Sequence, residues 1–523
     1  MGHEMFEGAA SLNMDEDAAA PRTSWPTWPI FAFIAAFWSF LLFGSGVIFS
    51  GGHFLDDHEI AEISNALKHQ SFGNTMRSYV IGDLGDRFRP MFWVQRVTQA
   101  GVFGAHYALW QLYGAVLAIA TTMLLYLFAR RIGLAIAESL ALPFLALVGQ
   151  QAVIWWRTGV QETLGMFLLS AALLALANSV FGKRRALWST AFVLLAVLMS
   201  LAKESFSIFT PALVFLAVWL EREARDSSWL DAIRANVAIG SALLVVLAVE
   251  IARIKLTINT AIGYDAHFGF DLVDWLRVIA FLGLIYAAIF VGIALIGAVG
   301  LKGSTRQERR ELAPKLWPPL LFAGIAVVRQ TLLYARSGIH ERYLNPTTTA
   351  LALLLVYAAA LLGAGRPRVR RLLLLLMLVA VAITSVYSFH IAQLYAIDGE
   401  TFNGALHYVE AETQPSSPIL VAADPASDLE FAVAVKEFLA FDGGRGNEYV
   451  YLLKTPSGPD PGYGEQTLQF YGHRVIGSLK GSPVPDAVIL TRRTEPEFVR
   501  EMGRLDAYRR VAFDAYVAYV RRK

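Results

Sequence analysis

Long apolar runs recur along the chain and set the first expectation about its fold. A helix crosses the hydrocarbon layer of a bilayer with about 20 apolar residues, and eleven runs approach that length. They lie at about 29–50, 104–128, 133–153, 160–180, 187–201, 205–220, 235–255, 275–300, 317–335, 346–364 and 372–392. The pattern predicts an α-helical polytopic membrane protein with about 11 transmembrane helices.

The pattern changes after residue 393, where short alternating segments replace the long apolar runs. Strands are predicted at 419–422, 449–453, 487–490 and 511–520, and helices at 429–441 and 495–505. Pro and Gly punctuate the linkers between these segments. We therefore expect a small C-terminal α/β domain at 394–523. It has no glycine-rich phosphate loop, so the sequence assigns it no chemistry.

Clusters of Lys and Arg predict the orientation of the bundle, because short loops rich in these residues stay cytoplasmic. The clusters at 130–131, 183–185, 222–225, 302–315 and 366–371 all fall on one side. The acidic N-terminal tail, 1–28, is then cytoplasmic and, by its composition, disordered. In the transmembrane domain, 29–393, the first outer loop is 51–103, and the C-terminal domain is extracytoplasmic. We expect the protein to reside in a bacterial cytoplasmic (inner) membrane as part of the cell envelope, with its C-terminal domain in the periplasm or outside.

Composition narrows the function classes. The chain is 55% hydrophobic and 17% charged, against about 45–50% and about 25% in soluble domains, which excludes an ordinary soluble enzyme. A net charge of +2 argues against nucleic acid as a partner. With no cysteine in the chain, thiolate catalysis and Cys-ligated zinc are also excluded.

The first outer loop opens with two adjacent carboxylates, Asp56 and Asp57, followed by His58. Crowded negative charge raises at least one pKa or recruits a cation. A carboxylate at the membrane boundary can also act as a general base toward an acceptor hydroxyl or amine. The alternative is a solvated acidic turn that caps a helix, since Asp is a favoured N-cap residue.

Arg87 and Arg89, further along the same loop, lie on the outer side against the positive-inside trend. Guanidinium groups bind phosphate bidentately, so these two are candidates for an anionic substrate. Pairing with Asp83 and Asp86, or with lipid headgroups, is the alternative.

Two later outer segments add cations. Lys203, beside Glu204, can hold a phosphate as a point charge, unless the two residues simply neutralise each other at a tight turn. Arg342 and Tyr343 come just before a late span, after His340 and Glu341. An arginine there can hold an anionic headgroup, whereas a tyrosine there is also an ordinary aromatic-belt anchor.

Three further outer residues are candidates for substrate contacts. Trp156 can stack on a sugar ring, and Gln161 and Glu162 can make polar contacts with it. Each is equally compatible with a simple position at the membrane interface.

Taken in order, Asp56–Asp57 after the first span, Lys203–Glu204 in mid-chain and Arg342–Tyr343 before a late span resemble the GT-C class of membrane glycosyltransferases. The chain is most similar to the bacterial relatives of protein O-mannosyltransferases and of the lipid A aminoarabinose transferase. The resemblance covers about 30–392 and implies a GT-C fold. It implies transfer of a sugar from a polyprenyl-phosphate donor to a glycan, lipid or protein acceptor.

The resemblance also implies roles for the residues. Asp56 would be the base of an inverting displacement, and Asp57, where the mannosyltransferase branch often has Glu, would shape the base, bind a cation or act in catalysis. Lys203, Arg342, Tyr343, Arg87 and Arg89 would hold the lipid phosphate. His58, Glu204, Trp156, Gln161, Glu162, His340 and Glu341 are the candidate substrate contacts. Whether a divalent cation, Mg or Mn, binds to Asp56 and Asp57 stays open.

Other classes of function compete with this interpretation. A transporter or flippase of lipid-linked sugars should concentrate ionisable groups near mid-membrane, whereas here they gather at the outer boundary. A polymerase or ligase of surface polysaccharide would favour a long outer loop late in the bundle, and this chain has its long loop first. A sensor with a ligand-binding outer domain is the remaining alternative.

Overall fold

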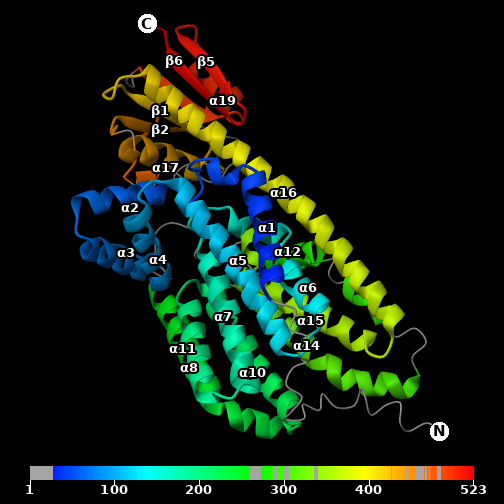
Figure 1. Ribbon diagram of the computed structural model, residues 1–523. Helices are drawn as coiled ribbons and strands as arrows, with labels where there is room; N and C mark the ends of the chain where they lie inside the picture. Colours follow the sequence, from blue (N-terminus) through cyan, green and yellow to red (C-terminus); the bar gives the residue numbers. More distant parts are fainter. Residues whose placement is uncertain are drawn as a thin grey trace, which may run out of the picture.

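The computed structural model describes residues 27–522 except 87, 259–271, 287–290, 296, 299–304, 335–339, 426, 443, 454–464, 466–467, 470–471, 480–483 and 504. Figure 1 shows a helical bundle with a small sheet at one end, linked by one very long helix, α16. Most of the tail predicted to be disordered, 1–26, lies outside the described residues.

The apolar runs form the helices of the bundle. Their bounds are α1 (Thr27–Gly44), α5 (Tyr107–Arg131), α6 (Ile136–Leu147), α7 (Gln161–Phe181), α8 (Arg185–Ser200), α9 (Glu204–Ser207), α10 (Thr210–Arg225), α11 (Trp229–Ile258), α12 (Leu272–Ile285), α14 (Arg306–Leu333), α15 (Thr347–Gly363) and α16 (Pro367–Glu412). Among the described residues, seven segments are long and apolar enough to cross a membrane, and four apolar helices are shorter. Each predicted run coincides with one of these eleven, so the polytopic helical class is confirmed.

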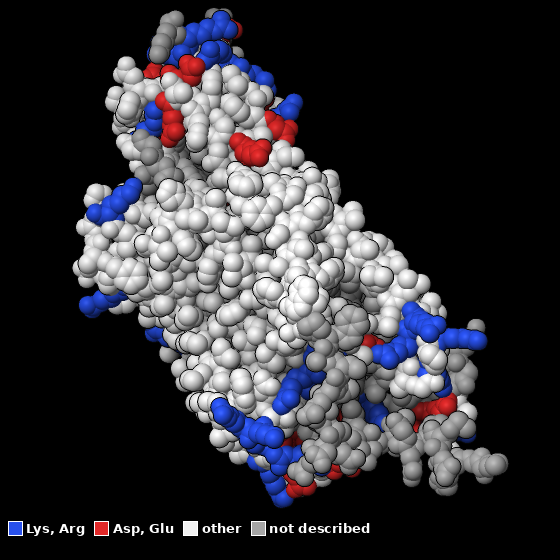
Figure 2. All heavy atoms as spheres, viewed as in Figure 1, with Lys and Arg blue, Asp and Glu red and all other residues white. Residues whose placement is uncertain are grey.

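The outward-facing surface of the bundle is apolar, as a lipid-facing surface must be. Phe31 and Phe40 on α1 and Ile383 and Val386 on α16 are all at least half exposed. Soluble proteins rarely expose contiguous apolar surface on this scale. On the face seen in Figure 2, charged side chains gather toward the two ends and leave a pale band between them. The chain is an integral membrane protein.

The first outer loop is itself helical, which the sequence did not predict. It contains α2 (His58–His69), α3 (Phe72–Asp86) and α4 (Pro90–Phe103). A small apolar cluster that includes Ile60, Ile63, Phe92 and Val97 holds these helices together above the bundle. Three short 3₁₀ turns border the same end: η1 (Val47–Phe49), η2 (Gln150–Trp155) and η3 (Glu341–Leu344).

The C-terminal domain is a six-stranded mixed sheet in the order β3-β2-β1-β4-β6-β5. Its strands are β1 (Ile419–Ala423), β2 (Glu448–Leu452), β3 (Val475–Ile476), β4 (Ala487–Thr491), β5 (Tyr508–Phe513) and β6 (Tyr516–Arg521), with α17 (Leu429–Glu437), a π turn η4 (Phe438–Asp442) and α19 (Glu495–Met502). The first four strands are parallel, and β6 and β5 join antiparallel.

Two details of this domain differ from the sequence prediction. The single strand predicted at 511–520 is wrong, because Asp514 adopts a left-handed conformation with φ 45° and turns the chain into the β5–β6 hairpin. The residues at the predicted boundary, 393 and 394, lie inside α16, which runs without a break from the bundle to the sheet.

The sheet domain also fixes the start of the first outer loop. Phe54 packs edge-on against Phe402 of α16 and Phe431 of α17, with ring centroids 6.2 and 6.3 Å apart. Helix α17 and η4 lie against α2. The loop that carries the two adjacent aspartates is therefore held between the bundle and the C-terminal domain.

Candidate functional site

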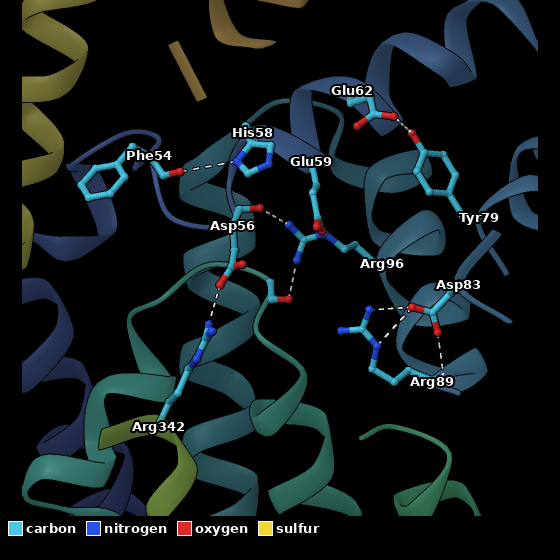
Figure 3. A network of polar contacts seen from close by, with 11 residues as sticks. Phe54, Asp56, His58, Glu59, Glu62, Tyr79, Asp83, Arg89, Arg96 and Arg342 are labelled. Atoms are coloured by element: carbon cyan, nitrogen blue, oxygen red, sulfur yellow. Dashed lines mark hydrogen bonds and ion pairs between the residues drawn. The ribbon is translucent and has the colours of Figure 1, made fainter. Parts of the chain in front are cut away.

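Asp56 stands at a bend between η1 and α2, with φ 65°. A left-handed conformation costs an L-residue about 1–2 kcal/mol, and it persists only where the surroundings impose it. The surroundings that hold Asp56 in this conformation come from three distant segments of the chain (Figure 3).

The carboxylate of Asp56 pairs with Arg342 of η3. Nη1 of Arg342 donates to Oδ2 of Asp56 over 2.6 Å, and Nη2 of Arg342 donates to the hydroxyl of Tyr343 over 3.1 Å. The Asp56 carboxylate and the Arg342 guanidinium are about one third and one fifth exposed, respectively. The pair is thus accessible from outside the protein.

The backbone of Asp56 is held by Arg96 of α4, whose side chain is almost fully buried. One guanidinium nitrogen of Arg96 donates to the carbonyl of Asp56, and the other donates to the carbonyl of Gly159 over 2.5 Å. Its Nε lies 3.2 Å from a carboxylate oxygen of Glu59. Gly159 has φ 67°, and a side chain there would overlap with the Arg96 guanidinium.

Arg96 is not among the residues predicted from the sequence, although one signal pointed to it. Phe92, Trp93, Arg96, Val97 and Ala100 have the i, i+3, i+4 spacing of one helix face, and all five are buried. An arginine on an otherwise apolar helix face is buried, and a buried charge requires partners.

The two adjacent aspartates have opposite electrostatic environments. Burial alone would raise the pKa of Asp56, but the Arg342 and Arg96 guanidiniums outweigh it and hold that pKa well below its usual range. Burial raises the pKa of Asp57 well above its usual range, and neither the hydrogen bond from His53 nor the Arg96 charge offsets it. Asp56 is therefore the ionised member of the pair, and Asp57 holds a proton more readily.

Asp57 has a structural connection to α16. It is the N-cap residue of α2, as the capping alternative predicts, but its side chain makes no capping hydrogen bond. Instead Oδ2 accepts a hydrogen bond from the backbone N–H of His53 over 3.0 Å. The His53 ring stacks on Tyr395 of α16 with ring centroids 3.6 Å apart.

Lys203 and Tyr343 join Asp56 and Arg342 in one cluster of side chains. Lys203 forms an ion pair with Glu162 at the start of α7, and both side chains are at least nine-tenths buried. The idea that Lys203 and Glu204 neutralise each other is therefore wrong. Nζ of Lys203 lies 4.3 Å from the centre of the Tyr343 ring, and the Arg342 guanidinium carbon lies 5.1 Å from it. Tyr343 thus contacts two cations.

The other candidates lie around this cluster. Arg89 donates to Asp83 through its backbone and side chain, at 2.5–3.1 Å, and Figure 3 shows that pair apart from Arg342. His58 faces the carbonyl of Phe54 at 3.4 Å, and Trp156 is fully buried, so its ring has no free face for a sugar. Gln161 is partly exposed at the start of α7, Glu204 begins α9, and His340 and Glu341 are exposed at η3. Arg87 lies outside the described residues.

The residues at this site do not fit a divalent cation. In the described part of the chain, His, Asp and Glu side chains do not gather in groups of three or more that could hold a metal ion. The Asp56 carboxylate already pairs with Arg342, and the Arg96 guanidinium donates to the backbone carbonyl of Asp56. We derive no chemical step through a metal.

Comparison with known proteins agrees with this fold. No family model matches the chain, and no curated protein matches it in sequence. ArnT from Cupriavidus metallidurans bound to undecaprenyl phosphate superposes with a TM-score of 0.52 at 16% identity, over 94% of this chain and 98% of ArnT. The apo form of the same ArnT gives 0.51 at 16% identity, over 94% and 97%. The oligosaccharyltransferase of Archaeoglobus fulgidus in its apo form is a weaker match, with a TM-score of 0.46 at 10% identity over 90% of this chain and 70% of that chain. The chain has the ArnT-like GT-C fold.

Proposed function

We propose that this chain is a membrane glycosyltransferase that moves a sugar from a polyprenyl-phosphate-linked donor to an acceptor on the outer face of the membrane. One observation carries the proposal. Asp56, Lys203, Arg342 and Tyr343 come from three distant parts of the chain and meet at one end of an ArnT-like bundle. A carboxylate beside two cations supplies both a base for an acceptor and positive charge for a departing phosphate.

Arg342 and Lys203 are the proposed phosphate-binding residues. A guanidinium binds a phosphate through a fork of N–H donors, and an ammonium binds it as a point charge. Both cations lie beside the Tyr343 ring, 4.3 and 5.1 Å from its centre, so they are close enough to each other to act on one phosphate. ArnT, which has the same fold, was solved with undecaprenyl phosphate bound, and this supports a lipid phosphate as the ligand. Arg89 pairs with Asp83 at a place apart from Arg342, so we leave it out of the phosphate-binding set.

Asp56 is the proposed base, and the phosphate of the donor controls its basicity. While Arg342 is paired with Asp56, the pKa of that carboxylate is low and it is a poor proton acceptor. A donor phosphate competes for the same guanidinium. Its arrival frees Asp56, adds a negative charge nearby and raises the pKa of Asp56. The base is therefore activated only when the donor is in place.

The reaction follows from these positions. The acceptor oxygen attacks the anomeric carbon, and the bond from that carbon to the phosphate oxygen breaks. The bonding pair leaves with the phosphate, where Arg342 and Lys203 stabilise the charge. The acceptor proton passes to the carboxylate of Asp56. Because this is a single displacement, the anomeric configuration is inverted.

Charge asymmetry supports the proposed orientation in a bacterial cytoplasmic membrane. The end of the bundle far from the sheet carries Arg185, Arg225, Arg366 and Arg370, each paired with a Glu, and Figure 2 shows basic side chains gathered there. The positive-inside rule makes that end cytoplasmic. The proposed site and the C-terminal domain then face the periplasm.

The test is release of sugar from short-chain polyprenyl-phosphate sugars by the purified protein in nanodiscs. Wild-type protein should consume at least one donor of the panel, and Asp56→Asn should reduce turnover at least a hundredfold, since general base catalysis contributes about 10²–10⁴. Unchanged turnover in Asp56→Asn would refute the base. If wild type consumes no donor yet moves lipid-linked sugar between leaflets, the protein is a transporter instead.

A further inference from the structure

The segment that leads into the proposed base is attached to α16. Residues 50–54 join η1 to the bend at Asp56. They lie against the part of α16 that runs from the bundle to the sheet (Figure 1). These contacts are separate from the pair of Asp56 with Arg342 and from the proposed phosphate-binding set.

Asn403 of α16 binds the backbone of this segment. Its Nδ2 donates to the carbonyl of Gly52 over 2.7 Å and to that of Ser50 over 3.2 Å. The same atom donates to the carbonyl of Gly399, one turn earlier in α16, over 2.6 Å. A carboxamide carries two N–H donors, so one side chain holds two carbonyls of the segment while it is anchored on its own helix.

Two glycines allow the segment and the helix to come this close. Gly51 has φ 78°, and a Cβ there would lie 2.6 Å from Nδ2 of Asn403. On α16, a Cβ at Gly399 would overlap with the His53 ring. Neither position has room for a larger residue unless the segment and the helix move apart.

His53 carries this fit to the two adjacent aspartates. Its backbone N–H donates to Oδ2 of Asp57 over 3.0 Å, and its ring stacks on Tyr395 of α16. Asp57 directly follows Asp56, so the path from α16 to the base is short. A shift of residues 50–53 along α16 would therefore move the base.

The other end of the segment is held separately. The Arg96 guanidinium donates to the carbonyl of Asp56, whose φ of 65° persists only where the surroundings impose it. The base is thus held from two sides. Arg96 holds the bend itself, and Asn403 sets where the chain enters it.

We propose that Asn403 is a positioning residue, which sets the place of the Asp56 carboxylate relative to the acceptor by holding residues 50–52 on α16. A misplacement of about 1 Å, even from a change far from the chemistry, can lower a rate about 10²-fold. The proposed phosphate-binding residues Arg342 and Lys203 lie in other segments, so donor binding does not depend on this contact. The inference rests on the proposed transferase function and gives α16 a part in it.

The experiment compares Asn403→Ala with Asn447→Ala in the full-length protein in nanodiscs. Asn447 is the matched control, because its amide also donates to a backbone carbonyl, that of Ser416, over 2.7 Å, but between two segments of the C-terminal domain. A further variant, Gly51→Ala, disturbs the Asn403 contact from the other side. Turnover, donor Kd and hydrogen exchange at residues 50–57 are measured for each protein.

Asn403→Ala should lower kcat about 10–100-fold at saturating donor, change donor Kd less than threefold and speed hydrogen exchange at residues 50–57. Gly51→Ala should have the same effects. The double variant should be no slower than the slower single variant, because both substitutions act on one contact. Asn447→Ala should match wild type in all three measurements.

An unchanged kcat in Asn403→Ala, or an equal loss in Asn447→Ala, would overturn the positioning role. So would a loss of donor affinity as large as the loss of kcat. Turnover by wild type decides the transferase separately. If wild type consumes no donor while Asn403→Ala speeds exchange at residues 50–57, the transferase is refuted and the hold of Asn403 on the segment is confirmed.

Discussion

Arg342 and Asp56 are 286 residues apart in the chain and are joined by a 2.6 Å hydrogen bond. The pair connects η3, just before α15, to the bend that follows η1. It favours the ionised form of Asp56, and both side chains of the pair are partly exposed. In the proposed mechanism a donor phosphate takes the place of Asp56 on Arg342, so that donor binding and activation of the base are a single event.

Arg96→Lys should lower turnover while leaving donor affinity nearly intact. A lysine cannot bind the carbonyls of Asp56 and Gly159 with two separate donors as the Arg96 guanidinium does. Asp56 would then lose the contact that holds its unusual backbone conformation. We expect kcat to fall about 10–100-fold, measured as sugar release at saturating donor, with less than a threefold change in donor Kd. An equal loss in both quantities would instead place Arg96 in phosphate binding.

Gly159→Ala should have a similar effect through the same contact. Gly159 has a positive φ and no room for a side chain beside Arg96, so the alanine must displace the guanidinium. Gly73→Ala, in α3, is the matched control, because nothing lies within 4 Å of its added carbon. We expect kcat to drop at least tenfold in the first variant and to stay unchanged in the second. Equal kcat values for the two variants would show that the position of Arg96 is unimportant.

Lys203→Met should reduce both stability and donor affinity, and a second substitution should separate the two effects. Removing one partner of a buried ion pair costs about 3–5 kcal/mol, since the other charge is left unpaired; here that charge is Glu162. Lys203→Met/Glu162→Gln should recover most of the melting temperature but not donor binding. The measurements are thermal unfolding and donor titration. Recovery of donor affinity in the double variant would mean that Lys203 has only a structural role.

Acid should destabilise the protein through His53. Burial, aided by the Arg157 charge, lowers the pKa of His53 from its usual 6.5 to about 3. Between those values the unfolded chain binds a proton that the folded chain does not, so stability falls as the pH falls, by about 1.4 kcal/mol per pH unit. Thermal unfolding from pH 7 to 4.5 should show this slope in wild type.

His53→Phe keeps a ring to stack on Tyr395 and cannot titrate, so its melting temperature should depend less on pH than that of wild type. His69→Phe changes an exposed histidine at the end of α2 and is the control. It should retain the slope of wild type. A wild-type slope in His53→Phe would assign the acid sensitivity to other groups.

Hydrophobic length predicted the bundle well, because a membrane span has a nearly fixed number of residues. The helices of the first outer loop were missed, since α2 and α4 are amphipathic, of mixed composition and follow no membrane rule. The β5–β6 hairpin was missed for a local reason. Its turn contains Asp514 rather than an Asn-Gly or Asp-Gly pair, which is the usual hairpin signal.

The sequence also identified the residues that meet at the site but not all of their contacts. Asp56, Lys203, Arg342 and Tyr343 were recognised as separate features of outer segments, and the structure brings them together. The partner of Lys203 could not be predicted, because Glu162 is distant in sequence while Glu204 is adjacent. Arg96 was detectable only from its place on an apolar helix face, where a charge implies buried partners.

The most direct test separates the two members of the Asp56–Arg342 pair. Asp56→Asn and Arg342→Gln are each assayed for binding of a polyprenyl-phosphate sugar and for its turnover. We predict that Asp56→Asn binds the donor at least as tightly as wild type, because Arg342 is freed, and turns it over at least a hundredfold more slowly. Arg342→Gln should lose donor affinity at least tenfold. Weakened donor binding in Asp56→Asn together with normal turnover in Arg342→Gln would contradict both assigned roles.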